Sequence, residues 1–128
     1  MLVADTDRWV GMETSIARTL TDDTALVTVR GEIDFSNSDE LARCVVAAIT
    51  EWSPTVVQVE LGDATFIDST GLGALIEGYR ATTETGAGFV VTNPTPGFRR
   101  VLTVTGLGDF FGVPEPADEA APAQATGT

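Results

Sequence analysis

Asp68, Ser69 and Thr70 carry the side chains best placed for chemistry in this sequence. They stand between the apolar stretch 64–67 and a helical pattern that begins near Ser69. An Asp or Ser at such a position commonly caps the helix, because its oxygen accepts hydrogen bonds from free N–H groups of the first turn. A hydroxyl exposed at the carboxyl end of a strand is also placed to receive a phosphate, which free N–H groups and the helix dipole would accommodate. The residues alone leave both interpretations open and favour the cap.

Other catalytic arrangements find no support in the sequence. The chain contains no His, which excludes Ser-His-Asp and Cys-His catalysis and removes the commonest metal ligand. It also lacks Lys, so no Walker loop can form, and Ile76 stands where the third glycine of a dinucleotide loop after Gly71 and Gly73 would be. Cys44 falls on a predicted apolar helix face and is expected to pack in the core. We therefore expect no enzyme, no metal and no cofactor of its own.

The charge balance argues against nucleic-acid and membrane partners. Seven basic residues against 19 acidic ones give a net charge of −12, a field that repels phosphate backbones and anionic membrane surfaces. The pair Arg99–Arg100 is expected to form a solvated helix face rather than an anion site. Residues 1–11 lack the runs of a signal peptide, and no apolar stretch approaches the ~20 residues that span a bilayer. With a single Cys as well, a cytoplasmic location is expected.

Composition divides the chain into a domain and two flanking segments. Residues 114–128 hold three of the six prolines and no Leu, Ile, Val or aromatic residue, which predicts a disordered acidic tail rich in Pro and Ala. Residues 1–12 are expected to form a flexible extension. One folded domain is therefore predicted over 13–113, and its oligomeric state is left open.

Strands and helices alternate within this domain. Strands are predicted from β-rich runs that end at turn residues, at 15–20, 25–30, 55–61, 88–92 and, as a short last strand, 109–113. The order β-β-α-β-α-β-α-β that they make with the three predicted helices indicates an α/β fold. We expect a single mixed sheet of four to five strands with the helices packed on it.

The three helices are predicted from apolar residues at helical spacing. The first carries its apolar face on Leu41, Cys44, Val45, Ala48, Ile49 and Trp52. Asn37 followed by Glu40 predicts a capping box at its start. The second begins near Ser69 and is broken by the glycines at 86–88. The third runs from Pro96 to Gly106, with Phe98, Val101, Leu102 and Thr105 predicted to share one face.

Residues 66–73, Phe-Ile-Asp-Ser-Thr-Gly-Leu-Gly, resemble the phosphorylation motif of the bacterial anti-sigma factor antagonists, a family of STAS domains. Three further segments fit that family in order. Residues 31–34 match the turn after its second strand, and residues 96–102 and 105–107 match the start and the close of its last helix. The resemblance covers about residues 14–113, nearly all of the predicted domain.

The resemblance implies a partner switch controlled by phosphorylation. Unphosphorylated members bind an anti-sigma factor that is also a Ser/Thr kinase of the histidine-kinase-like ATPase superfamily, and so release the sigma factor. The kinase, with its own ATP and Mg²⁺, phosphorylates the Ser of the motif, and a PP2C-type phosphatase restores the hydroxyl. By this resemblance Ser69 is the phosphoacceptor. Thr70 is a second hydroxyl in a less favoured position, which departs from the family pattern.

The resemblance also implies a partner-binding surface, made of Asp34, Asp68, Ser69, Thr70, Gly71 and Leu72. An alternative within the same fold is a STAS-type nucleotide- or lipid-binding module, or a signalling scaffold, without sigma-factor switching. Phosphorylation of Ser69 by a kinase would favour the first interpretation, and tight binding of a small molecule without modification would favour the second.

Overall fold

The computed structural model describes residues 15–113, and every element below belongs to this part of the chain. The elements are β1 (Ser15–Thr21), β2 (Thr24–Ile33), α2 (Ser38–Trp52), β3 (Val56–Ile67), α3 (Ser69–Thr85), β4 (Gly88–Thr92), α4 (Pro96–Thr105) and α5 (Leu107–Phe110). The predicted flexible extension at 1–12 and disordered tail at 114–128 lie outside the described residues.

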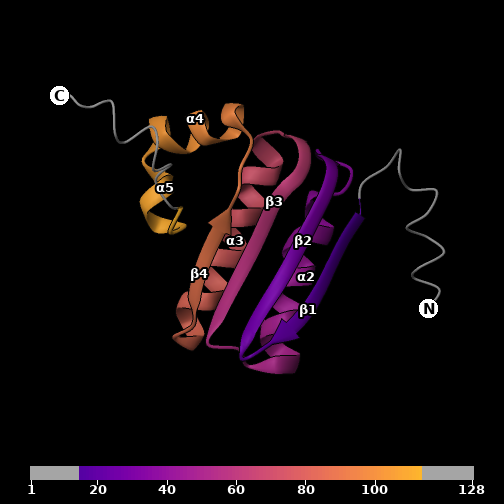
Figure 1. Cartoon of the computed structure of the whole chain (residues 1–128), viewed down its shortest axis with the longest axis vertical. Helices are drawn as coiled ribbons and strands as arrows, with labels where there is room; N and C mark the ends of the chain where they lie inside the picture. Colours follow the sequence, from indigo (N-terminus) through magenta and orange to yellow (C-terminus); the bar gives the residue numbers. More distant parts are fainter. Residues whose placement is uncertain (1–14, 114–128) are drawn as a thin grey trace.

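The strands form one mixed sheet in the order β1-β2-β3-β4. β1 pairs with β2 antiparallel, whereas β2 with β3 and β3 with β4 pair parallel. Figure 1 shows α2 and α3 behind this sheet, on one of its faces, with α4 and α5 beside β4. The predicted α/β class and single mixed sheet are confirmed. β2 and β3 end side by side at the upper edge in Figure 1, so the segments that follow these two strands meet there.

The core lies between the sheet and the two helices behind it. Alternate side chains of β2, β3 and β4 are fully buried, as strand geometry requires, among them Val27, Val29, Val57, Val59 and Val91. The predicted face of α2 packs on them, with Leu41, Val45 and Ala48 inaccessible to solvent. Cys44 is half-buried against this core, and burial raises the pKa of its thiol. It is a packing residue with little thiolate character.

The predicted last strand at 109–113 is wrong. Leu107–Phe110 forms the short helix α5, in which the N–H of Phe111 donates to the carbonyl of Leu107 at 3.0 Å. Phe111 then lies beside β4 and accepts a hydrogen bond from the N–H of Val91 at 2.8 Å, and Gly112 at φ 61° prevents an extended continuation. The ring of Phe111 is buried against Phe89 at 5.5 Å, so burial of an aromatic side chain produced the apolar pattern that predicted a strand.

The predicted apolar face of the third helix is half right. α4 buries Phe98 and Leu102, but Val101 is 41% exposed and Thr105 is exposed. The close at Gly106 is confirmed, because this residue adopts φ 76° and its N–H donates to the carbonyls of the last turn.

The carboxyl half of β3 is longer than predicted and is fixed to β4 by Glu60. The carboxylate of Glu60 accepts hydrogen bonds from the Thr92 hydroxyl at 2.6 Å, the Asn93 amide at 2.9 Å and the Gly62 N–H at 3.0 Å. Partial burial alone would raise the pKa of Glu60, but these hydrogen bonds outweigh it and lower the pKa. The register of β2 against β3 shifts beside Gly31, whose φ of 85° only glycine adopts readily. Irregular backbone therefore leads both strands into the edge where the candidate site lies.

Candidate functional site

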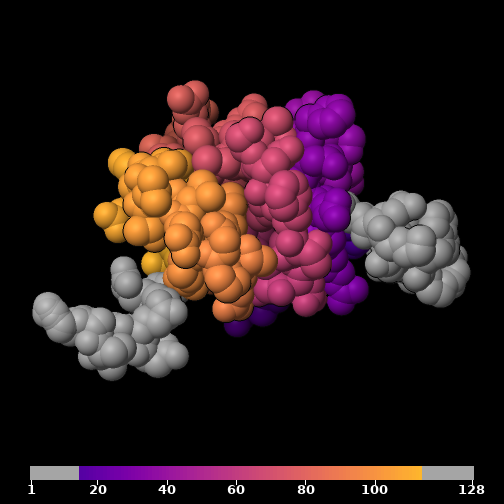
Figure 2. Space-filling model, turned by 90° about the horizontal axis from the view of Figure 1, so that it is seen from above, coloured from indigo at the N-terminus to yellow at the C-terminus, as the bar shows by residue number. Residues whose placement is uncertain are grey.

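The ends of β2 and β3 bring two short segments of the chain together. Ile33 pairs with Ile67 in the last register of the ladder, and the N–H of Asp68 donates to the carbonyl of Ile33 at 3.1 Å. The turn at 34–37 and the first turn of α3 are therefore neighbours. Figure 2, seen from above, shows purple atoms of the first part of the chain directly against the rose atoms of the middle part on this edge.

Asp68 is the N-cap of α3. Its Oδ1 accepts hydrogen bonds from the N–H groups of Thr70 at 2.9 Å and Gly71 at 3.1 Å, and from the Thr70 hydroxyl at 2.5 Å. The hydrogen bond from the Thr70 hydroxyl, followed by those from the two amides, lowers the pKa of Asp68 against a smaller opposing effect of burial. The capping interpretation of this position is correct for Asp68.

Ser69 and Thr70 differ sharply in what their hydroxyls do. Both residues are exposed, but the Thr70 hydroxyl is held by Asp68. The Ser69 side chain makes no hydrogen bond to any residue that the structure describes. It projects from the first position of α3 into solvent. Of the two adjacent hydroxyls, that of Ser69 is the one without a hydrogen bond to a described residue.

The amides expected to accommodate a phosphate are already in use. The N–H groups of Thr70 and Gly71 donate to the Asp68 carboxylate, and the N–H of Leu72 donates to the Asp68 carbonyl at 3.1 Å. A phosphate on Ser69 would therefore sit beside the Asp68 carboxylate and would have to compete with it for these donors. The expectation of free amides is therefore wrong for Thr70 and Gly71 in the unmodified protein.

Gly71 and Leu72 pack the first turn of α3 against the rest of the domain. Gly71 is buried, and a Cβ on it would lie 2.5 Å from Cγ2 of Ile67 and 2.8 Å from Cγ2 of Ile33. Only glycine lets α3 start this close to the strand ends. Leu72 is half-buried and packs against the core. Of the predicted partner-binding residues, the structure therefore brings Asp34, Asp68, Ser69 and Thr70 to the surface and places Gly71 inside.

The turn at 34–37 is organised by Asp34 and Asn37. Oδ1 of Asp34 accepts from the N–H of Ser36 at 3.0 Å and from its hydroxyl at 2.6 Å. Oδ1 of Asn37 accepts from the N–H of Asp34 at 2.9 Å, and its amide donates to the carbonyl of Glu32 at 3.0 Å. The predicted capping box is wrong, because Asn37 closes this turn and its side chain makes no capping hydrogen bond to α2.

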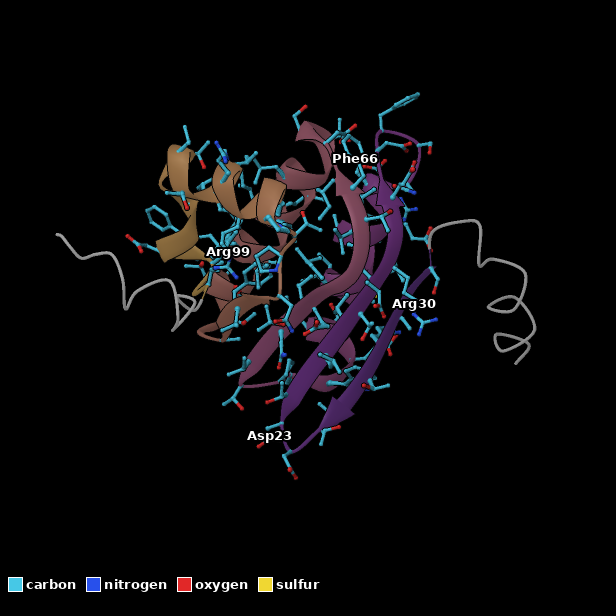
Figure 3. The ribbon with its side chains drawn as sticks, turned by 45° about the horizontal axis from the view of Figure 1, so that its top comes forward. Asp23, Arg30, Phe66 and Arg99 are labelled. Carbon is cyan, nitrogen blue, oxygen red and sulfur yellow. The ribbon has the colours of Figure 1, made fainter. Side chains whose placement is uncertain are left out.

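Two phenylalanines border the site, and the search for chemically reactive residues missed both. Phe35 is 81% exposed in the turn, and Phe66 is 52% exposed near the end of β3. Figure 3 shows Phe66 at the upper end of the sheet, opposite the end that carries Asp23. The signal for Phe66 was strand alternation: Ile67 packs toward Gly71 and Ile33, so its neighbour must point the other way.

Replacing Asp68 by Asn is expected to remove part of the pH dependence of stability. The pKa of the folded carboxyl is lowered, so its contribution is complete above the pKa of an unfolded Asp and is lost as the pH falls through the lower folded pKa. Asn keeps an oxygen that caps a helix but does not titrate there. Urea unfolding between neutral and strongly acid pH should show the wild type losing more stability than Asp68→Asn. Equal losses would contradict this account of the cap.

The site is a surface that carries exposed hydroxyl groups at the start of α3. Within residues 15–113, no group of three potential metal-ligating side chains comes together. None of the helices in the described part of the chain combines the length and the apolar character needed to cross a bilayer.

Known proteins share this fold. The STAS domain family matches residues 15–120. An anti-sigma F factor antagonist from Lysinibacillus sphaericus is 27% identical over 92 residues, which cover 72% of this chain and 79% of that protein. The crystal structure of an anti-sigma factor antagonist from Mycobacterium paratuberculosis is 28% identical, with a TM-score of 0.72 over 87% of this chain and 93% of that one.

The fold is also that of the antagonist SpoIIAA. Its unphosphorylated form matches at 19% identity with a TM-score of 0.68, covering 89% of this chain and all of that one. Its phosphorylated form, from Bacillus, matches at 20% identity with a TM-score of 0.64, covering 86% of this chain and all of that one. At these identities the likeness concerns the fold.

Proposed function

Because the chain belongs to the STAS domain family, we propose that it is an anti-sigma factor antagonist that works by partner switching. Its unphosphorylated form would bind an anti-sigma factor that is also a Ser/Thr kinase, and this binding would release the sigma factor. The observation that carries the proposal is the contrast between the free, exposed hydroxyl of Ser69 and the hydroxyl of Thr70, which Asp68 holds. The protein itself is a regulator and not an enzyme.

Phosphorylation of Ser69 would end the interaction. The Ser69 hydroxyl oxygen attacks the γ-phosphorus of ATP held with Mg²⁺ by the kinase, ADP leaves, and the hydroxyl proton passes to a base of the kinase. A PP2C-type phosphatase then hydrolyses the phosphoserine, which releases inorganic phosphate and restores the hydroxyl of Ser69. The exchange takes place in the cytoplasm, where ATP and the transcription machinery are.

The phosphate would act by blocking the interface rather than by unfolding the domain. It adds about −1.5 to −2 charges next to the Asp68 carboxylate, whose amide donors are already engaged. A negative group at a helix N-terminus is tolerated by the helix dipole, so the fold should persist. An uncompensated charge buried against a partner costs roughly 2–5 kcal/mol, which is enough to separate the two proteins.

Incubation with the candidate kinases and ATP, followed by phosphopeptide mapping, tests the proposal. We expect phosphate on Ser69 and none on Thr70. Ser69→Ala should abolish modification. Thr70→Val should leave it in place, because the Thr70 hydroxyl is hydrogen-bonded to the N-cap residue Asp68. Absence of modification by every encoded kinase of that superfamily, together with tight binding of a nucleotide or lipid, would replace this proposal by the ligand-binding alternative.

A further inference from the structure

We propose that Phe35 and Phe66 form an apolar anchor that the anti-sigma factor must cover. This inference rests on the proposed function. It states that these two side chains supply most of the binding free energy of the surface around Ser69. The occupant is a folded protein with an apolar cleft for two aromatic rings and a rim of Arg or Lys side chains.

Exposure marks these two side chains. Phe35 at 81% is the most exposed large apolar side chain in the described part of the chain, and Phe66 is 52% exposed. A phenylalanine buries roughly 150–250 Å² when it is covered, so two of them supply a large share of the apolar area of a small interface. The exposed part of each ring contributes little to folding, whereas it gains when a partner removes it from water.

The fold holds both rings beside the phosphoacceptor. Glu32 pairs with Phe66 and Ile33 with Ile67 in the ladder, so the turn carrying Phe35 begins where the strand carrying Phe66 ends. Asp68 is hydrogen-bonded to Ile33, which ties the start of α3 to the same point. The turn itself is fixed by its Asp34 and Asn37 hydrogen bonds, so Phe35 is presented on an ordered support. A preorganised aromatic side chain is the usual form of a binding hot spot.

Charge identifies the chemistry of the occupant. The segments 31–37 and 63–72 carry four carboxylates, on Glu32, Asp34, Asp63 and Asp68, and no basic residue. Arg30 reaches Asp63 at 3.7 Å, but nothing comparable neutralises Asp68, which binds only hydroxyl and amide donors. An apolar surface with an unneutralised carboxylate beside it, that of Asp68, favours a partner with a basic side chain at the matching position. A second copy of this chain, with its net charge of −12, does not meet that requirement.

The anchor explains why one phosphate on Ser69 would be enough to end binding of the partner. If the aromatic contacts supply most of the affinity, the partner must approach closely enough to bury both rings, and Ser69 lies inside that footprint. A phosphate there is desolvated against Asp68 whenever the rings are covered. Loss of the hydroxyl alone, as in Ser69→Ala, leaves the rings and the contact intact.

Four alanine variants of the full chain test the anchor, and the chain supplies matched controls. Phe35→Ala is compared with Val104→Ala on α4, because these side chains are 81% and 78% exposed, and Phe66→Ala with Phe110→Ala, because these are 52% and 57% exposed. The probe is the kinase found to phosphorylate Ser69, bound to ADP. We expect Phe35→Ala to weaken its binding about 30-fold or more, and Phe66→Ala about tenfold or more. The controls should stay within about twofold, and the unfolding midpoint of Phe35→Ala should stay within about 2 °C of the wild type.

The outcomes separate the anchor from the switch. If both site variants bind like their controls while the wild type is still bound and phosphorylated at Ser69, the anchor is wrong and the proposed function stands. If the wild type is neither bound nor phosphorylated by any such kinase, the proposed function fails and the anchor fails with it. Affinity lost only in the two site variants, with folding unchanged, supports both.

Discussion

Ser69→Glu is expected to bind the anti-sigma factor 30-fold to several-thousand-fold more weakly than the wild type, an estimate of about 2–5 kcal/mol for a buried uncompensated charge. The side chain at this position has no partner of its own among the described residues, and the nearest acid, Asp68, already holds the first amides of α3. The new carboxylate therefore meets a like charge in the complex. Because Ser69 is exposed, the stability of the free protein should change by no more than about 0.5 kcal/mol. Isothermal titration with the kinase measures the first effect, and urea unfolding measures the second.

Two further variants control this result. Thr83→Glu adds the same charge to an exposed position near the other end of α3, and it should bind like the wild type. Ser69→Ala should also bind like the wild type and should resist phosphorylation. Weak binding by Thr83→Glu would show that net charge, rather than charge at Ser69, governs the interaction.

Gly71→Ala is expected to destabilise the protein by about 1–3 kcal/mol, an overpacking cost. The added Cβ would lie 2.5 Å from one isoleucine methyl and 2.8 Å from another, and both belong to β-branched side chains with few alternative rotamers. Ile33 is fully buried, so it has no room to move away. Urea unfolding gives the change in free energy directly.

Gly73→Ala is the matched comparison, two residues further along the same helix. A Cβ at Gly73 meets nothing within 4 Å, and the residue is exposed. Alanine should therefore stabilise the protein by about 0.5–1 kcal/mol through helix propensity alone. If both substitutions had the same effect, close packing of α3 on the ends of β2 and β3 would not be what requires Gly71.

Periodic segments of this fold were predictable because burial alone determines them. The alternation in β2 and the spaced apolar residues of α2 correspond to buried faces, and Gly106 ends α4 as its position predicts. The segment 109–113 was not predictable, since a short apolar run fits a strand as well as a turn that buries one aromatic ring. Here Phe111 supplies that ring. Its N–H donates a hydrogen bond to the carbonyl of Leu107, and its carbonyl accepts one from the N–H of Val91.

The helix start at Asp68 and Ser69 was predictable in position but not in detail. The resemblance favoured Ser69 over Thr70 as the phosphoacceptor, but the sequence did not show how the two hydroxyls differ. In the structure the Thr70 hydroxyl is hydrogen-bonded to Asp68, and that of Ser69 has no hydrogen bond to a described residue. The predicted capping box was wrong because the side chain of Asn37 accepts a hydrogen bond from the N–H of Asp34 and so closes the turn before α2. Phe35 could not be identified as a site residue from the sequence, because the exposure of an apolar residue in a turn depends on tertiary structure.

The most direct test of the switch is a comparison of partner affinity between the unmodified protein and the same protein phosphorylated at Ser69. Both forms are titrated into the ADP-bound kinase, and their circular dichroism spectra are recorded beforehand. We expect superimposable spectra and an affinity at least about 30-fold lower for the phosphorylated form. Near-equal affinities of the two forms would contradict it.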